Sequence, residues 1–259
     1  ATFAKLKPAF FSGVNTLYDA ILNHPDFASL DFSNLRLSLQ GGTALRSGTA
    51  ERWRAVTGCP VVEGYGLSET AAAITYNRPD GNNPVGSIGM ALAEVEITLR
   101  NEQGQIVPIG EPGELCARGP QMTKSYWNQP EETVNAFFDG DWFRTGDIAR
   151  ADEQGYYYVL DRRKDMILVS GFNVYPNEIE DVVGQHPGVL EAAAVGVPDD
   201  KCGEAVRLVV VRSDPALTED EVRAHCRKNL TGYKQPRVIE FRDSLPKSAV
   251  GKILRRELR

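Results

Sequence analysis

The order of elements in residues 35–66 constrains the fold more than any other feature of this chain. The segment "LRLSLQ" (35–40) predicts a strand that ends at a glycine pair, and "SGTAERWRAVTG" (47–58) predicts a helix closed by Gly58. The segment "CPVVEGYG" (59–66) predicts a second buried strand with a glycine turn. This order of strand, helix and strand indicates an α/β layer built on a parallel sheet.

The pattern changes twice further along the chain. Alternating residues around Asn/Gly turns predict β-hairpins from about 84 to 120, and "QPEETVNAFF" predicts a helix that begins at Pro130. After "DRRKD" (161–165), strands alternate with two helices that begin at Pro176 and Thr218, the second with a capping box. We therefore expect an α/β part followed by a small α+β domain. A charged run such as 161–165 is most often a solvated linker.

Composition excludes several classes of function. The net charge of the 259 residues is −6, and no basic stretch interleaves with aromatics, so we expect no nucleic-acid partner. The apolar stretches are too short to span a bilayer, and the first residues do not form a signal peptide. The four cysteines form no CxxC pair, which is typical of a reducing compartment. The three histidines lack metal-ligand spacing, so we expect no structural metal. Because free thiols are typical of a reducing compartment, we expect a cytoplasmic location.

Two glycine turns carry the first sign of chemistry. In "EGYGLSET" (63–70), a tyrosine between glycines can lie against a flat base, and Ser68 at a helix start suits a phosphate. A carboxylate beside phosphates, here Glu69, can hold Mg²⁺. A plain strand–helix turn explains the segment equally well. The segment "GGTAL" (41–45) follows the preceding strand, and two such turns at one sheet edge favour a nucleotide.

An aspartate after a glycine adds a third candidate. Asp147 in "WFRTGDIA" can accept from both hydroxyls of a ribose, although a turn residue is the simpler interpretation. Arg162, at the domain junction, is placed to reach the same sugar.

Taken together, six segments resemble the acyl-CoA synthetases of the adenylate-forming superfamily, and most closely the C-terminal portion of bacterial long-chain fatty-acid–CoA ligases. They occur in order along the chain: "GGTAL", "EGYGLSET", "GELCARGP", "DWFRTGDIA", "DRRKDMILVSGFNVYPNEIE" and "LPKSAVGKILRRELR". The resemblance implies ATP-dependent formation of an acyl-AMP and then transfer of the acyl group to coenzyme A. It also implies that residues 1–160 belong to a large AMP-binding domain, 161–165 to a hinge and 166–259 to a small lid domain.

The resemblance assigns roles residue by residue. It implies that Ser68 touches phosphate, that Glu69 binds Mg²⁺ and that Lys164 is the hinge. It further implies a frame for adenine, a pair that holds the ribose and a loop along the CoA path, made respectively by Gly42, Thr43, Ala44, Gly64, Tyr65 and Gly66, by Asp147 and Arg162, and by Ser170, Gly171 and Phe172.

Lys252 matches the family's catalytic lysine. A positioned ammonium would offset the repulsion between the substrate carboxylate and the ATP α-phosphate. The simpler interpretation is a tail lysine on a solvated basic helix, because Arg255, Arg256 and Arg259 follow it.

The family's Ser/Thr/Gly-rich loop, which holds the β- and γ-phosphates, has no counterpart in these residues. We therefore expect the upstream part of the large domain to be missing, the chain alone to be inactive, and an open sheet edge to favour self-association. A homodimer and peripheral contact with the inner face of the membrane stay open. So do an aryl- or medium-chain acyl-CoA ligase, a carrier-protein-loading enzyme, and a non-catalytic module that binds AMP or CoA.

Overall fold

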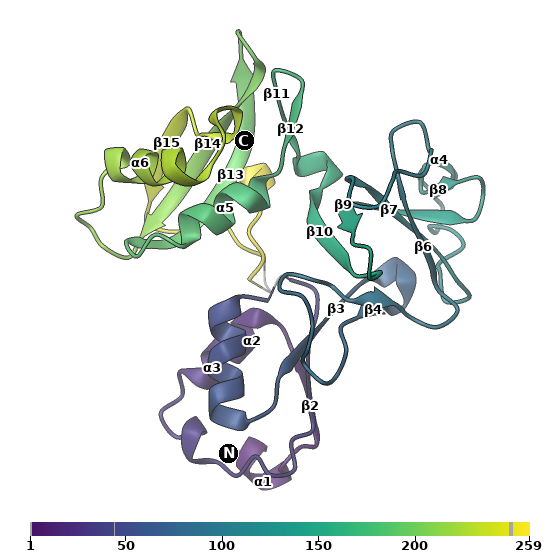
Figure 1. Cartoon of the computed structure of the whole chain (residues 1–259), viewed down its shortest axis with the longest axis vertical. Helices are drawn as coiled ribbons and strands as arrows, with labels where there is room; N and C mark the ends of the chain where they lie inside the picture. The colour runs from purple at the N-terminus through teal and green to yellow at the C-terminus, as the bar shows by residue number, and fades with distance from the viewer. Residues whose placement is uncertain (1, 44, 249–250) are drawn as a thin grey trace. The chain divides into compact units, whose positions relative to one another are not determined.

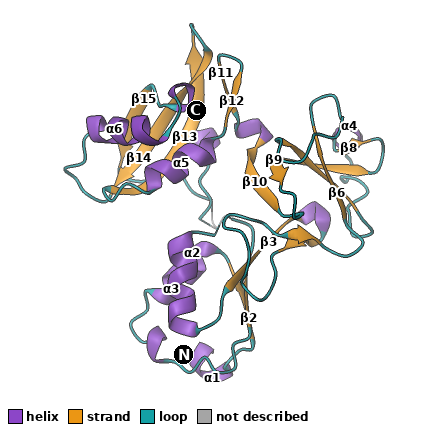
Figure 2. Ribbon diagram, viewed as in Figure 1, coloured by secondary structure: helices purple, strands orange, loops and turns teal. Residues whose placement is uncertain are grey.

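The computed structural model describes residues 2–43, 45–248 and 251–259, and it divides the chain into two compact units, Ala1–Val159 and Leu160–Arg259 (Figure 1). Helices, strands and loops alternate throughout both units (Figure 2). The mixed α/β character predicted from the sequence is confirmed.

The first sheet of the first unit has the strand order β1-β2-β3-β4-β5. Strands β1, β2 and β3 are parallel, as the strand–helix–strand order predicted, whereas β4 and β5 are antiparallel additions. An aromatic core around Trp53 and Tyr18 packs beneath the helices of this layer. The elements are α1 Thr2–Leu6, β1 Phe10–Gly13, α2 Asn15–Leu22, η1 Phe27–Ser29, β2 Leu37–Gln40, α3 Ser47–Thr57, β3 Val61–Leu67, η2 Ser68–Thr70, β4 Ala72–Tyr76 and β5 Met90–Ala91.

A second sheet in this unit has the order β10-β9-β7-β6, and β8 pairs with β9. Its antiparallel β6–β7 pair confirms the hairpin predicted for this region, and helix α4 begins at the predicted Pro130. The elements are β6 Glu96–Arg100, β7 Gly113–Arg118, α4 Pro130–Asn135, β8 Phe137–Phe138, β9 Trp142–Ala151 and β10 Tyr157–Arg162.

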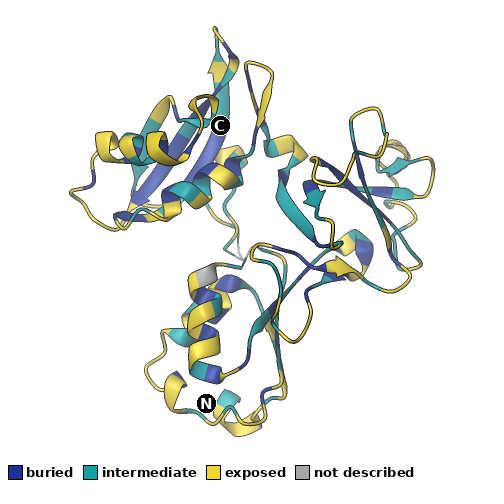
Figure 3. Ribbon diagram, in the orientation of Figure 1, coloured by how far each residue is buried: buried dark blue, intermediate teal, exposed yellow. Residues whose placement is uncertain are grey.

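The second unit is built on the long antiparallel pair β13–β14, in which buried and half-buried residues predominate (Figure 3). Because side chains alternate along a strand, β13 serves two cores. Ala194 packs with residues of helices α5 and α6, whereas Ala193 and Val195 pack with Leu245 and Leu258 of the C-terminal segment. The elements are η3 Arg163–Asp165, β11 Ile167–Val169, β12 Phe172–Val174, α5 Pro176–Gly184, β13 Val189–Asp199, β14 Gly203–Arg212, α6 Glu219–Asn229, η4 Gly232–Lys234, β15 Val238–Arg242 and η5 Arg255–Glu257.

Local end signals account for several helix boundaries. Gly58 ends α3 in the left-handed region, with φ of 73°, and its N–H donates to the Arg54 carbonyl at 2.9 Å. Thr218 and Glu221 form both bonds of the predicted capping box at the start of α6. No helix among the described residues is long and apolar enough to cross a membrane.

Candidate functional site

The segment after β3 is a tight turn between two strands, so the helix predicted from "EGYGLSET" is wrong. Ser68–Thr70 form one 3₁₀ turn, and β4 then runs antiparallel to β3. The buried hydroxyl of Thr70 closes the turn, because it accepts from the Leu67 N–H at 2.9 Å and donates to the Ala72 carbonyl at 2.7 Å. A phosphate role for Ser68 therefore has no support from a helix N-terminus.

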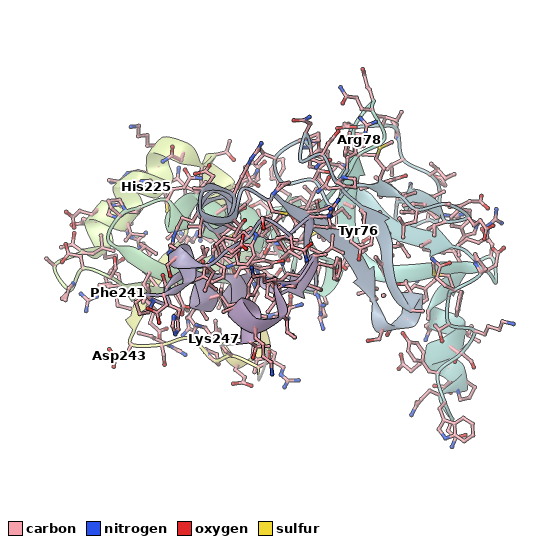
Figure 4. The ribbon with its side chains drawn as sticks, turned by 90° about the horizontal axis from the view of Figure 1, so that it is seen from below. Tyr76, Arg78, His225, Phe241, Asp243 and Lys247 are labelled. Atoms are coloured by element: carbon pink, nitrogen blue, oxygen red, sulfur yellow. The ribbon has the colours of Figure 1, made fainter. Side chains whose placement is uncertain are left out.

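Packing within this hairpin explains the two glycines around Tyr65. A Cβ atom on Gly64 would overlap the ring of Tyr76, which is labelled in Figure 4, and one on Gly66 would overlap the backbone of Ala72. The group that approaches these glycines is the chain's own strand β4. A ligand is therefore not needed to explain why glycine stands at both positions.

Two predicted site residues lie together in the first unit. The hydroxyl of Tyr65, on β3, donates to Oδ2 of Asp147, on β9, at 2.6 Å. Asp147 is buried, and its own N–H donates to the Thr145 hydroxyl at 3.1 Å. This contact joins one strand of each sheet through residues 82 positions apart. It fixes the tyrosine ring beside a buried carboxylate.

Glu69 has a partner that the sequence did not indicate. Its Oε1 accepts from the hydroxyl of Tyr126 at 3.0 Å, and its carbonyl accepts from the Thr123 N–H at 2.7 Å. Burial, and to a lesser extent the hydrogen bond to Glu69, raises the pKa of Tyr126 to about 12. Tyr126 therefore remains a hydrogen-bond donor at neutral pH and holds the Glu69 carboxylate in one orientation.

The loop that follows β2 is held from inside the sheet. The Gln40 side-chain amide donates to both the carbonyl and the hydroxyl of Thr43, and the Leu45 N–H donates to the Glu63 carboxylate at 3.1 Å. Gln40 and Glu63 are neighbours in the parallel β2–β3 register. Burial raises the pKa of Glu63 to about 7. Sequence reasoning missed both residues. Gly42 adopts a φ of 82°, and Ala44 lies outside the described residues.

The remaining predicted residues belong to the second unit. Arg162 ends β10, and its N–H donates to Oδ1 of Asp161 at 2.7 Å. Lys164 is exposed within η3, and its carbonyl accepts from Arg259 at 2.8 Å. Asp161 is only 1% exposed, and burial raises its pKa to about 6. The interpretation of 161–165 as a solvated linker is therefore wrong for Asp161, which lies inside the unit, whereas Arg163 and Lys164 are exposed.

Ser170 and Gly171 form the exposed turn between β11 and β12, and the exposed Phe172 begins β12. Ser170 and Gly171 have φ of 51° and 85°, and the ring of Phe172 stacks on Tyr233 with centroids 4.7 Å apart. The Ser170 N–H donates to the Cys202 carbonyl at 2.8 Å, which anchors the turn to the β13–β14 connection.

Lys252 lies on a short hairpin near the C-terminus. The Ser248 N–H donates to the Lys252 carbonyl at 2.8 Å, and Gly251 turns the chain with a φ of 80°. The prediction of a basic helix after Lys252 is wrong, because Arg255–Glu257 form a single 3₁₀ turn. The side chain of Arg255 is only 15% exposed and pairs with acidic groups, so a solvated face does not describe it.

Family models match most of the chain. The AMP-binding enzyme model matches residues 1–127, and the AMP-binding enzyme C-terminal domain model matches residues 178–252. The chain therefore belongs to the AMP-binding enzymes, and the resemblance predicted from its motifs is confirmed.

Individual relatives narrow this class. The chain is 54% identical over 256 residues, 99% of its length, to the long-chain-fatty-acid–CoA ligase of Escherichia coli O157:H7. It is 41% identical over 249 residues, 95% of its length, to a feruloyl-CoA synthase of Amycolatopsis. It spans about half of these relatives, 46% and 50% of their lengths.

A solved structure supports the same fold. The crystal structure of ATP-bound MatB from Rhodopseudomonas palustris matches 100% of this chain and 52% of its own, with a TM-score of 0.92 and 36% identity. The match extends over both units. The described chain therefore has the fold of the matched half of an adenylate-forming enzyme.

Proposed function

We propose that this chain forms part of a long-chain fatty-acid–CoA ligase, which uses ATP to convert a fatty acid to acyl-AMP and then to acyl-CoA. The observation that carries the proposal is the 54% identity to a curated long-chain ligase along 99% of the chain. A carboxylate oxygen attacks the α-phosphorus and pyrophosphate leaves. The CoA sulfur then attacks the acyl carbon, AMP leaves, and the thiol proton passes to solvent.

The first unit would bind the nucleotide. Tyr65 would pack against the adenine, framed by Gly42, Thr43, Ala44, Gly64 and Gly66, while Asp147 accepts from the ribose and Ser68 touches phosphate. The bond from Tyr65 to Asp147 supports this assignment, because it holds an aromatic ring beside a buried carboxylate. Arg162, in the second unit, is proposed as the second ribose ligand.

Glu69 fits a magnesium ion delivered with the nucleotide. Its carboxylate is held by Tyr126, and the described residues include no cluster of three His, Cys, Asp or Glu side chains that could bind a metal alone. Mg²⁺ commonly takes one or two carboxylates and completes its shell with phosphate oxygens and water. The ion would neutralise phosphate charge, and Glu69 would orient it.

The second unit would supply the catalytic cation and the CoA path. Lys252 would offset the charge of the two anions that meet at the α-phosphorus. Ser170, Gly171 and Phe172 would line the pantetheine path, and Lys164 would be the pivot of a hinge at 161–165 between domains 1–160 and 166–259. The two compact units divide between Val159 and Leu160.

Lys252→Ala tests this assignment in a protein of the relatives' full length that contains this chain. We expect acyl-AMP formation to slow about 10²–10³-fold, the usual loss for one electrostatic donor. CoA attack on supplied acyl-AMP should stay near the parental rate. The exposed Lys201→Ala, in the β13–β14 connection, is the matched control. Parental rates in both steps would remove Lys252 from the mechanism.

The substrate and the form of the protein need separate assays. Thioester formation over a series of fatty and aromatic acids would distinguish a long-chain ligase from a medium-chain or aryl ligase such as the 41%-identical feruloyl-CoA relative. We propose that this chain alone binds AMP weakly and does not turn over. We also propose that the protein works in the cytoplasm, with peripheral contact to the inner face of the membrane, and that it forms a homodimer. Pyrophosphate release by the purified chain at ordinary enzyme rates, about 1–10³ s⁻¹, would contradict the inactive form.

A further inference from the structure

Arg255 lies at the centre of a buried polar network in the second unit. Its guanidinium pairs with Glu180 at 2.7 Å and with Asp161 at 3.4 Å, and it donates to the Asn177 side chain at 2.6 Å. Asp165 lies at 3.7 Å from the same group. One cation therefore serves three carboxylates that come from the domain junction and from helix α5. The planar guanidinium suits this arrangement because it makes four hydrogen bonds here, whereas an ammonium has three donors.

The network extends into the main sheet of the unit. Oε1 of Glu180 also accepts from the Ala194 N–H, on β13, at 2.9 Å. Asp161 accepts from the Asn177 N–H at 2.7 Å. Arg255 thus ties the C-terminal segment to α5, to β13 and to the junction.

The hairpin that bears Lys252 ends directly before Arg255. The Leu254 N–H donates to the Pro246 carbonyl at 2.9 Å, and the Lys252 N–H donates to the Ser248 hydroxyl at 3.2 Å. Ile253 packs on the core formed by β13, β14 and the C-terminal segment. At the other end of the hairpin, Lys247, labelled in Figure 4, pairs with Glu191.

The two stems of this hairpin are anchored unequally. The Lys247–Glu191 pair is partly exposed, with side-chain exposures of 38% and 20%, and pairs in contact with water contribute little. Arg255 is 15% exposed and faces Asp161, which is 1% exposed. The strong anchor of the hairpin is therefore on the returning stem, three residues from Lys252.

We propose that Arg255 is a positioning residue that sets the location of Lys252 by fixing the returning stem of its hairpin to Asp161 and Glu180. The inference rests on the proposed catalytic role of Lys252. Arg255 acts through the backbone of residues 252–255 and contacts no substrate.

Amide hydrogen exchange in this chain tests the anchoring without any activity. In Arg255→Met, we expect the hairpin amides of Ser248 and Leu254 to lose protection by about tenfold or more, while β13–β14 amides such as Val195 and Val209 keep theirs. Arg256→Met changes the same charge at an exposed neighbour and should leave all four amides unchanged. Equal protection of the hairpin in Arg255→Met and the parent would overturn the proposal.

A second substitution covers the case in which Arg255→Met unfolds the unit. Arg255→Lys keeps the charge and loses the fork, so the hairpin amides should still exchange faster than in the parent. If the hairpin amides of Arg255→Lys keep parental protection, or lose it only in step with Val195 and Val209, the anchor is not Arg255.

A double-mutant cycle on acyl-AMP formation, in the full-length protein, separates positioning from general support. Arg255→Lys should slow this step in the parent, and should add less than about twofold in a Lys252→Ala background. Multiplied losses would show that Arg255 acts independently of Lys252 and would overturn the proposal. A Lys252→Ala variant with parental rates would instead refute the proposed role of Lys252, and the exchange result would then still report whether Arg255 anchors the hairpin.

Discussion

Glu63 allows a quantitative test of the loop that follows β2. Its carboxylate accepts from the Leu45 N–H at 3.1 Å, and burial raises its pKa from the ordinary 4.5 to about 7 despite that bond. Glu63→Gln keeps a carbonyl oxygen for Leu45 but removes the titration. The substitution therefore isolates the cost of burying the charge.

The sign follows from proton binding. Between pH 4.5 and about 7, the folded chain holds a proton on Glu63 that the unfolded chain has released. The stabilising contribution of Glu63 is thus complete below pH 4.5 and is lost as pH rises through about 7. The difference between these two pKa values corresponds to a loss of on the order of 3 kcal/mol in the free energy of unfolding. The Gln variant should not show this loss.

Tryptophan emission supplies the assay. All three tryptophans, Trp53, Trp127 and Trp142, lie in the first unit, so their emission during urea unfolding reports on that unit alone. Unfolding free energies of parent and Glu63→Gln are compared from pH 4 to pH 8. Other titrating groups are common to both proteins, so they cancel in the difference.

We expect the variant to gain about 3 kcal/mol relative to the parent over this range, with the change centred between pH 4.5 and about 7. A difference that stays constant with pH would show that Glu63 is ionised in the folded chain as freely as in water. A difference of opposite slope would show that the Leu45 bond outweighs burial.

Three further predictions test other parts of the structure. Gly66→Ala should lower the free energy of unfolding in urea by about 3 kcal/mol or more, because its Cβ would meet the Ala72 backbone. Gly48→Ala, in α3 with open space around it, should stabilise the protein by about 1 kcal/mol. Equal effects of the two substitutions would contradict the close packing of β3 against β4. Tyr65→Phe removes the 2.6 Å donor to the buried Asp147 and should lower the free energy of unfolding by about 1–3 kcal/mol. It should also weaken AMP binding in titration calorimetry. Unchanged stability and affinity would show that the Tyr65–Asp147 bond has neither role. Thr218→Ala should lower the stability of the second unit by about 1 kcal/mol in thermal unfolding followed by circular dichroism. No loss would show that the capping box does not contribute to the stability of this unit.

Features determined by neighbouring residues were predictable from the sequence. The parallel β2–β3 pair, the glycine end of α3 and the capping box of α6 depend on periodicity and on residues within one turn. The family motifs placed the candidate residues, and the relatives confirm the family.

Features determined by distant partners were not predictable. The 3₁₀ turn at Ser68–Thr70 replaces a helix because β4 pairs with β3 at once, and the segment's helical signals are too weak to oppose that pairing. Arg255 looked like a solvated arginine because its partners Glu180 and Asp161 lie 75 and 94 residues away. Tyr126 donates a hydrogen bond to Glu69, 57 residues earlier in the chain, and no local sequence pattern predicts that contact.

The position of Asp161 in the chain gives its buried contacts a further meaning. Asp161 precedes Lys164, the proposed pivot, whereas Asn177 and Arg255 follow it. A turn about Lys164 would therefore pull the Asp161 carboxylate away from both partners and return it to water. The two orientations of such a hinge would differ in the solvation of the Asp161 carboxylate. Acid conditions that protonate Asp161 would therefore change the free-energy difference between the two orientations.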